Sequence, residues 1–225
     1  YAGDHTTFAN LSSSLARAGR RAVAVDLPSH GATPIAAVTL DDLSPNLIAF
    51  ARSFFAGARP HVVASSMGAV PAVALAAALE PASLSLLCPV GLGLHIDGSF
   101  LDGMAQAESA GEIAHLLSRV TEGPPPITAD GLAAVADGLV KGRLTALASA
   151  LHNGGRQRVS LVPPIARLAE RIPVRVLVGE RDLILDARDA TGISPRIAVH
   201  HFARVGHMPH WEAPAETLAI LLGNR

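Results

Sequence analysis

The chain has 225 residues and a formal net charge of −1, from 18 lysines and arginines against 19 aspartates and glutamates. This balance excludes an overall basic surface for binding nucleic acid or an anionic membrane. The single cysteine, Cys88, excludes a disulfide framework and a cysteine metal cluster, and it is typical of a reducing cytoplasm. The length fits one globular domain with room for a small insertion.

No signal-peptide pattern is visible at the start of the given sequence. It opens at Tyr1 without a methionine, and without the basic and apolar stretches that signal peptides contain. The longest apolar runs, such as 70–79, are much shorter than the roughly 20 residues that cross a bilayer. We therefore expect a cytoplasmic protein that does not bind membranes, and whose natural start has been processed away or lies upstream of Tyr1.

The first ninety residues alternate between helical and strand patterns. Apolar residues recur every three or four positions from Asp4 to Arg17, which predicts an amphipathic helix. Ser44 and Pro45 are typical of a helix N-terminus and open a second helix. In chain order, the predicted elements are a helix over 4–17, a strand over 21–26, a helix over 45–55, a strand over 61–64, a helix over 67–79 and a strand over 83–88.

The alternation is interrupted from 91 to 165, where the pattern predicts about four helices and no convincing strand. Strands are predicted again over 174–178 and 196–200, and a helix over 214–222 closes the chain. Alternating strands and helices indicate an α/β protein with a parallel sheet and right-handed crossovers. We therefore predict a core made of residues 1–90 and 166–225, with a helical cap over 91–165.

The sharpest local signal is a Val-Val-Ala-Ser-Ser-Met-Gly segment, in which a strand turns abruptly into a helix at Ser66. A tight nucleophile elbow needs small residues two positions before and after the serine, and Ala64 and Gly68 stand there. The helix N-terminus would offer the N–H of Met67 to a developing oxyanion. Two alternatives stay open: Ser65 as the nucleophile, and a serine-rich turn whose hydroxyls only cap the helix.

A nucleophilic serine needs a histidine base and a carboxylate that orients the base. Asp182 and His207 each follow a predicted strand, in the chain order serine, acid, histidine. Loops after parallel strands converge at one edge of the sheet, so these side chains are expected to meet. Asp186 and Glu180 are alternatives for the acid, and the alternatives for the base are His30, His200, His201 and His210.

Other ligand-binding patterns are weak. Gly91 and Gly93 resemble the start of a dinucleotide-binding loop, but no further glycine and helix follow at the right spacing. His200 and His201 are neighbours in a predicted strand and point to opposite faces, which does not favour a metal site. We therefore expect no cofactor and no metal.

Four segments resemble the α/β-hydrolase superfamily, in the right order and along nearly the whole chain. They are Asp26-Leu-Pro-Ser-His-Gly31, the elbow around Ser66, Pro173-Val-Arg-Val-Leu-Val-Gly-Glu-Arg-Asp182, and Gly206-His-Met-Pro-His-Trp-Glu-Ala-Pro214. The cap gives a narrower likeness, in the segments Val90–Gly103 and Gly154–Gln157. It is similar to the hydrolase-like C-terminal domain of the acetyltransferase (E2) component of acetoin dehydrogenase complexes.

The resemblance implies an α/β-hydrolase fold in which Ser66 is the nucleophile, Asp182 the acid and His207 the base. It also implies an oxyanion site formed by the backbone N–H groups of Met67 and Tyr1. In the family a strand precedes the position of Tyr1, and this sequence does not contain it.

Three positions depart from the family pattern. Ser29 and Ala64 stand where glycines are usual, and Ser65 stands where histidine is usual. The first two are tolerable if the backbone φ angles at these residues stay negative. The third reshapes the floor of the site beside the nucleophile.

We predict a serine hydrolase of the carboxylic ester hydrolase class. It would cleave an ester, thioester or activated carbonyl of a small apolar substrate through an acyl-enzyme on Ser66. Two alternatives stay open: an acyltransferase-type module of an acetoin or 2-oxo acid dehydrogenase complex, and a catalytically weak binding member of the fold. The expected partner is a small-molecule acyl substrate, not nucleic acid or a membrane, and a homodimer is compatible with the sequence.

Overall fold

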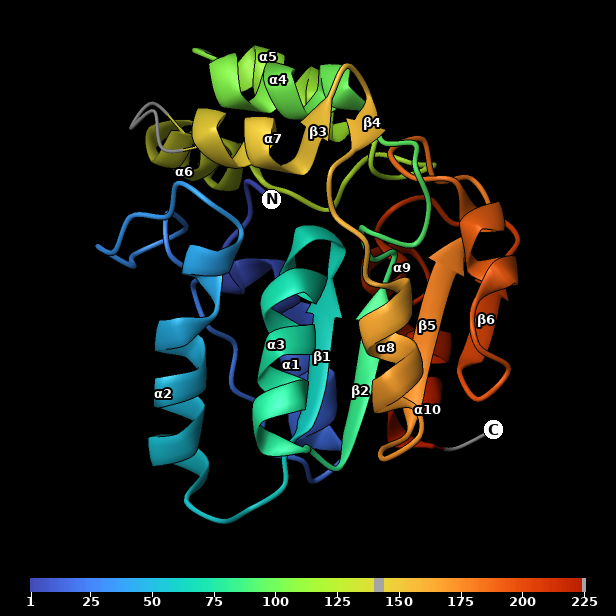
Figure 1. Ribbon diagram of the computed structural model, residues 1–225. Coiled ribbons are helices and arrows are strands. Elements are labelled where there is room, and N and C mark those ends of the chain that lie inside the picture. Colours follow the sequence, from blue (N-terminus) through green and yellow to red (C-terminus); the bar gives the residue numbers. More distant parts are fainter. Residues whose placement is uncertain (140–143, 224–225) are drawn as a thin grey trace.

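The computed structural model describes residues 1–139 and 144–223. Its main sheet has four parallel strands in the order β1-β2-β5-β6 (Figure 1). They are β1 (His61–Ser65), β2 (Ser83–Leu87), β5 (Val174–Gly179) and β6 (Ala198–Phe202). The predicted α/β architecture with a parallel sheet is confirmed, and each of these strands starts within two residues of its predicted position.

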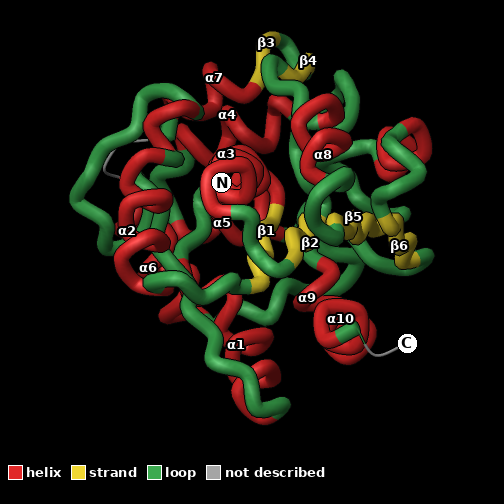
Figure 2. Tube along the Cα trace, turned by 60° about the horizontal axis from the view of Figure 1, so that its bottom comes forward, coloured by secondary structure: helices red, strands yellow, loops and turns green. Residues whose placement is uncertain are grey.

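Helices cover both faces of this sheet. On one face lie α3 (Ala69–Leu79) and α8 (Val162–Leu168), with α2 (Pro45–Phe55) beside α3, and on the other face lie α1 (Ala9–Arg17) and α10 (Pro214–Leu222) (Figures 1 and 2). Short 3₁₀ turns, η1 (His5–Phe8) and η3 (Ser66–Gly68), lead into α1 and α3. Across residues 1–139 and 144–223, the helices are too short or too polar to cross a membrane.

The core between α3 and the sheet is close-packed because α3 presents small side chains to the strands. Ala69, Ala72 and Ala76 are at most 4% exposed, and they let the helix axis approach the sheet. β2 is buried along its whole length, as expected for a central strand covered on both faces. The side chains that complete this cluster come from β2, β5 and α8: Leu84, Leu86, Val174, Val176, Ile165 and Leu168.

A layer of helices covers the carboxyl edge of the sheet (Figure 1). It contains α4 (Gly98–Gln106), α5 (Ala110–Leu117), α6 (Ala129–Leu139) and α7 (Thr145–Leu151), whereas residues 140–143 of the predicted cap lie outside the described residues. Asp97 caps α4 by accepting a hydrogen bond from the N–H of Phe100. Ser109 and Glu112 form a capping box on α5.

The structure adds a short antiparallel pair that the sequence analysis does not predict. β3 (His152–Asn153) and β4 (Arg156–Gln157) are joined by Gly154 and Gly155, whose φ angles are 56° and 75°. Positive φ at both central residues belongs to a two-residue hairpin turn, and glycine adopts it without strain. α8 then crosses residue 165, the predicted end of the cap, and packs on α3. We count α8 with the core and keep the division into core and cap as an interpretation.

The prediction of a strand over 21–26 is wrong. Residues 21–26 form neither a helix nor a strand, and Val23 and Val25 are 42% and 39% exposed. Alternating apolar residues indicate an extended chain with one apolar side, but a strand also needs a hydrogen-bonded neighbour. Within the described residues, β1 pairs only with β2, and residues 21–25 line a cavity that β1 also lines.

A short helix near the C-terminus, α9 (Pro209–Glu212), packs against the first turn of the chain. The ring of His210 stacks on Phe8 with 4.9 Å between centroids, and the indole N–H of Trp211 donates to the Thr7 carbonyl at 2.9 Å. Both ring nitrogens of His210 are buried, and the backbone of Thr7 lies beside the ring. Burial lowers the pKa of His210 to about 4, so its ring is neutral at pH 7.

Core packing by β2 yields a first prediction. Leu86→Ala removes a side chain that is 0% exposed and leaves a cavity between the sheet and α3. The free energy of unfolding should fall by about 2–5 kcal/mol. Leu94, at 58% exposure, provides the matched control, and Leu94→Ala should change that free energy by less than about 0.5 kcal/mol. Urea unfolding measures both, and equal losses would contradict the described core.

The burial of His210 predicts a loss of stability in acid. In the unfolded state the histidine has a pKa near 6.5 and binds a proton below that pH. In the folded state the pKa of His210 is about 4, so the ring binds a proton only at a lower pH. Stability is therefore fully present above pH 6.5 and falls as the pH decreases toward 4, by about 3 kcal/mol from this residue. His210→Phe keeps the stacking on Phe8 and should remove this part of the pH dependence.

The measurement for His210 is urea unfolding at several pH values between 7 and 4 for both proteins. The two proteins share every other side chain, so the difference between their unfolding free energies reports the contribution of residue 210. His115→Gln, at an exposed position, is the control and should leave the pH dependence unchanged. Parallel curves for wild type and His210→Phe would refute a buried neutral imidazole.

Candidate active site

The turn from β1 into η3 gives Ser66 a strained backbone. Its φ angle is 53°, in the left-handed region that residues other than glycine rarely adopt. Such strain costs on the order of 1–3 kcal/mol and is typical of functional sites. A methyl group added to Gly68 would meet the Ala64 side chain at 3.9 Å, an ordinary contact, so the elbow has room for alanine at position 64.

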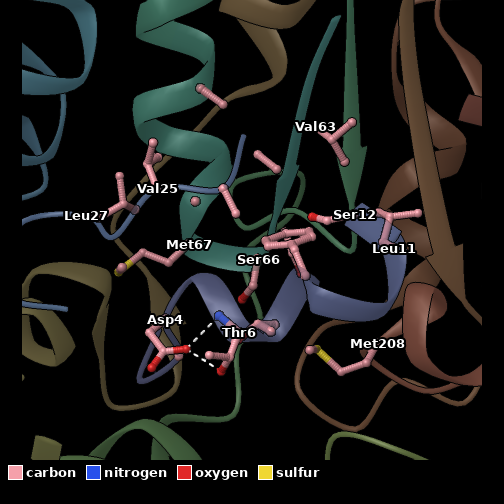
Figure 3. Close-up of a pocket in the computed structure, with 18 of the residues that line it drawn as sticks. Asp4, Thr6, Leu11, Ser12, Val25, Leu27, Val63, Ser66, Met67 and Met208 are labelled. Carbon is pink, nitrogen blue, oxygen red and sulfur yellow. Dashed lines mark hydrogen bonds between the residues drawn. The ribbon is translucent and has the colours of Figure 1, made fainter. Parts of the chain in front are cut away.

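Ser66 lines a large cavity, and Met67, Leu27 and Met208 are among the other side chains that line it (Figure 3). The alternative nucleophile, Ser65, has an extended backbone with φ of −119°. Its hydroxyl oxygen is buried and has no hydrogen-bond partner among the described residues. The strained position and the open hydroxyl both favour Ser66 over Ser65.

Asp182 and His207, predicted from separate strand ends, are in direct contact. The Nδ1–H of His207 donates to Asp182 Oδ2 at 2.7 Å, and the two side chains are 5% and 3% exposed. The other carboxylate oxygen of Asp182 accepts hydrogen bonds from the N–H groups of Ile184 at 2.8 Å and Leu185 at 3.1 Å. With Nδ1 committed to a carboxylate, Nε2 of His207 is left to accept a proton.

The alternative acids have other partners. Asp186 binds the Arg188 guanidinium at the surface, and these hydrogen bonds lower the pKa of Asp186 to about 2. Glu180 lies 3.6 Å from Nδ1 of His201, with half of its side chain exposed. Across the part of the chain that the structure describes, neither carboxylate forms a hydrogen bond or ion pair with His207, whereas Asp182 does.

Two of the alternative bases are buried and neutral. His30 donates from Nδ1 to the carbonyl of Pro28 at 2.9 Å, and burial lowers the pKa of its ring to about 4. His30 lines the same cavity as Ser66, a position that the sequence analysis treats only as a turn. His210 stacks on Phe8, as described above. Position beside a buried carboxylate distinguishes His207 from both.

The cavity that contains Ser66 and His207 has a volume of about 910 Å³. Its walls near the sheet edge are mainly apolar and come from both the core and the cap, and they include Val90, Ile96, Phe100, Leu101, Leu117 and Ile184. The cavity also extends past β1 to the segment 20–25. An apolar chamber of this size, with a few polar groups at one end, is typical of a small-molecule site.

The two predicted oxyanion residues lie at this cavity. Met67 is 1% exposed and follows Ser66 at the start of η3. The side chain of Tyr1 reaches into the cap, where its hydroxyl donates to the carbonyls of Leu101 at 3.1 Å and Leu144 at 3.3 Å. Burial raises the pKa of the Tyr1 hydroxyl, which keeps it a donor. The use of the Tyr1 and Met67 N–H groups for an oxyanion stays a prediction.

Ser29, which stands where the family usually has glycine, does not have the negative φ angle that we expected. Ser29 has a φ of 64°, not a negative angle. Its hydroxyl accepts a hydrogen bond from the N–H of Ala37 at 2.8 Å and lies 3.3 Å from the Ala37 carbonyl, and these contacts offset the strain. Ala64 is not among the residues with positive φ.

Cys88 is a neighbour of the site that the sequence analysis did not identify. Its sulfur lies within 4.8 Å of ligand atoms of Asp182 and His207. Burial raises the pKa of the Cys88 thiol, and a protonated thiol is a poor metal ligand. The position of Cys88 in the sequence could have indicated this. Cys88 follows the end of β2, which is hydrogen-bonded to β5, so it lies at the same edge of the sheet as Asp182.

Curated proteins include two relatives of this chain, from Cupriavidus necator and Pseudomonas putida. Each is named as the dihydrolipoyllysine-residue acetyltransferase component of an acetoin cleaving system, and each is 30% identical over 208 residues. The matches cover 88% and 87% of this chain but 54% of each relative. The chain therefore spans about half the length of these relatives.

Solved structures share the fold at low sequence identity. The meta-cleavage product hydrolase from Pseudomonas fluorescens has a TM-score of 0.79 at 16% identity, covering 100% of this chain and 87% of that one. An esterase from Exiguobacterium antarcticum has a TM-score of 0.75 at 12% identity, covering 98% and 87%. The model of the alpha/beta hydrolase family matches residues 2–220. The chain therefore belongs to the α/β-hydrolase family, as the resemblance predicts.

Proposed function

We propose that the protein is a serine hydrolase that cleaves an ester, thioester or activated carbonyl of a small apolar substrate. The observation that carries this proposal is the buried hydrogen bond between Asp182 and His207, beside the apolar cavity that Ser66 lines. A histidine oriented by a carboxylate is the base that activates a serine hydroxyl. The strained φ angle of Ser66 adds support, because elbows present their nucleophile in this way.

In this mechanism the hydroxyl oxygen of Ser66 attacks the carbonyl carbon of the substrate while Nε2 of His207 takes the hydroxyl proton. The carbonyl oxygen becomes an oxyanion, which the N–H groups of Met67 and Tyr1 would stabilise. Collapse of this intermediate releases the alcohol or thiol, which receives the proton from His207, and leaves an acyl group on Ser66. A water molecule, deprotonated by His207, then attacks the acyl group and frees the acid and Ser66.

The cavity supports a substrate with a compact apolar acyl group. Cap side chains such as Phe100, Leu101 and Leu117 line it together with Val90 and Ile184 from the core. Burial of such a group against these walls contributes roughly 25 cal/mol per Å² of apolar surface. Among the carbonyl compounds of the proposal we favour carboxylic esters, and the named esterase with the same fold is consistent with this choice.

Acyl transfer is the second candidate function. It is favoured by the relatives named as acetyltransferase components, although the chain spans only about half of their length. A thiol would then replace water as the acceptor of the acyl group on Ser66. Addition of coenzyme A or dihydrolipoamide to an ester assay distinguishes the two, because transfer yields a thioester and hydrolysis yields the free acid. A binding protein of this fold would yield neither.

The nucleophile is tested with a fluorophosphonate probe, which reacts with activated serines. Wild type should be labelled, and Ser66→Ala should lose the labelling and the ester turnover, because the variant has no attacking oxygen. Ser65→Ala, one residue away, is the matched control and should retain most of the labelling. Equal labelling of wild type and Ser66→Ala would show that Ser66 is not the nucleophile.

The acid is tested with Asp182→Asn. An amide at this position can donate a hydrogen to His207 and favour the wrong tautomer, so kcat should fall by roughly 10³–10⁴-fold with the fold intact. Asp186→Asn provides the matched control, since this carboxylate binds Arg188 at the surface and should leave kcat within about twofold of wild type. A normal kcat for Asp182→Asn would rule out the proposed pair, and circular dichroism checks folding.

A further inference from the structure

The loop that carries His207 is bonded directly to the linker between α5 and α6. The backbone N–H of His207 donates to the carbonyl of Val120 at 2.8 Å, although these residues lie on different layers of the molecule. On the sheet side, the carbonyl of Val205 accepts a hydrogen bond from the N–H of Arg181 at 3.0 Å, just after β5. The histidine loop is therefore held between the end of β5 and the cap.

A single carboxylate, that of Glu212 in α9, joins the same two segments. Its Oε2 accepts the N–H of Gly206 at 2.8 Å, and its Oε1 accepts the N–H of Glu122 at 2.7 Å. One oxygen therefore holds the residue before His207, and the other holds the cap linker two residues after Val120. We call this pair of hydrogen bonds the Glu212 bridge.

The packing around Gly206 leaves no space for these segments to move independently. A Cβ atom added to Gly206 would lie 3.0 Å from the Val120 carbonyl oxygen and 3.2 Å from Cα of Thr121. On its other side, the carbonyl oxygen of Gly206 occupies the place that a side chain on Gly179 would take. Backbone therefore touches backbone on both sides, and a displacement of the linker displaces the loop that carries His207.

We propose that Glu212 is a positioning residue that couples the seating of the cap to the placement of His207. This inference rests on the proposed serine hydrolase mechanism, in which Nε2 of His207 must meet the Ser66 hydroxyl. A shift of about 1 Å in a reacting group can reduce the rate about 100-fold. The Glu212 bridge prevents such a shift, and it makes the catalytic base competent only while the cap linker is in place.

The chemistry of the bridge requires a carboxylate. Glutamate offers two acceptor oxygens, one for each N–H group. Glutamine offers one acceptor oxygen, and its NH₂ group would face the second N–H as a donor. Glu212→Gln should therefore keep half of the bridge, whereas Glu212→Ala removes both halves.

The test compares Glu212→Ala and Glu212→Gln with wild type, using p-nitrophenyl butyrate as the substrate and fluorophosphonate titration to count active sites. Per active site, kcat should fall between about 10- and 100-fold in Glu212→Ala, with KM within about twofold, because the cavity walls are unchanged. Glu212→Gln should lie between Glu212→Ala and wild type. Glu216→Gln, at an exposed position in α10, is the control and should match wild type.

Hydrogen exchange gives a second measurement that does not depend on turnover. In Glu212→Ala, the amides of 120–123 and of 205–208 should both exchange faster, by a similar factor, because one group protects both segments. A merely structural Glu212 would lower the melting temperature and leave kcat per active site at the wild-type value. That result, or faster exchange in only one segment, would overturn the coupling.

The two proposals fail in different ways. A wild-type protein that neither hydrolyses the ester nor reacts with the probe would refute the serine hydrolase, and the exchange measurement alone would then decide on the Glu212 bridge. An active wild type with unchanged kcat and unchanged exchange in Glu212→Ala would refute the bridge and leave the hydrolase standing.

Discussion

The site depends on one buried hydrogen bond, from His207 to Asp182. Burying a carboxylate is unfavourable unless its oxygens are satisfied, and here the imidazole and the N–H groups of Ile184 and Leu185 satisfy them. This arrangement requires β5 to end just before Asp182. It also requires the loop that carries His207 to pass over the end of β5. The return is possible because Gly179 has no side chain where the carbonyl of Gly206 lies.

Backbone strain gathers at the same edge of the sheet. Ser66 and Cys88 follow two adjacent parallel strands, β1 and β2, and both have positive φ, at 53° and 41°. Residues without glycine's freedom hold such angles only where the surroundings enforce them. β1 pairs with the buried β2, and α3 packs against both strands, so the segments before and after the elbow at Ser66 are both held in place. The stability of the core thus maintains the backbone geometry of Ser66, the proposed nucleophile.

Sequence patterns predict the parallel sheet, its helices and the contact between Asp182 and His207, because each depends on short-range periodicity or on the edge where parallel strands end. They do not predict features that depend on a partner elsewhere in the chain. Residues 21–26 have a strand pattern but, within the described part of the chain, no strand to pair with. Gly154 and Gly155 close a hairpin through their positive φ angles, which the sequence pattern did not indicate. The hydrogen bond from the Glu122 N–H to Glu212 also depends on a partner far away in the sequence. The segment Gly206–Pro214 includes Glu212, but nothing in the local pattern indicates an acceptor for the cap.

The cap and the catalytic loops also share a hydrophobic cluster, so the pocket cannot be reshaped separately from the chemistry. Met67, Ile184, Leu185 and Met208 lie close to Ser66, Asp182 and His207 along the chain. They are buried together with four residues of the cap: Phe100, Leu101, Met104 and Ile113. Ile184 and Leu185 are also the residues whose N–H groups hold Asp182. A substitution in the cap that changes the volume of the cavity therefore also changes the packing behind Asp182. Selection for a new substrate must preserve both the shape of the cavity and the packing behind Asp182. This favours changes at cavity-wall positions such as Leu117, which is only partly buried in the cluster.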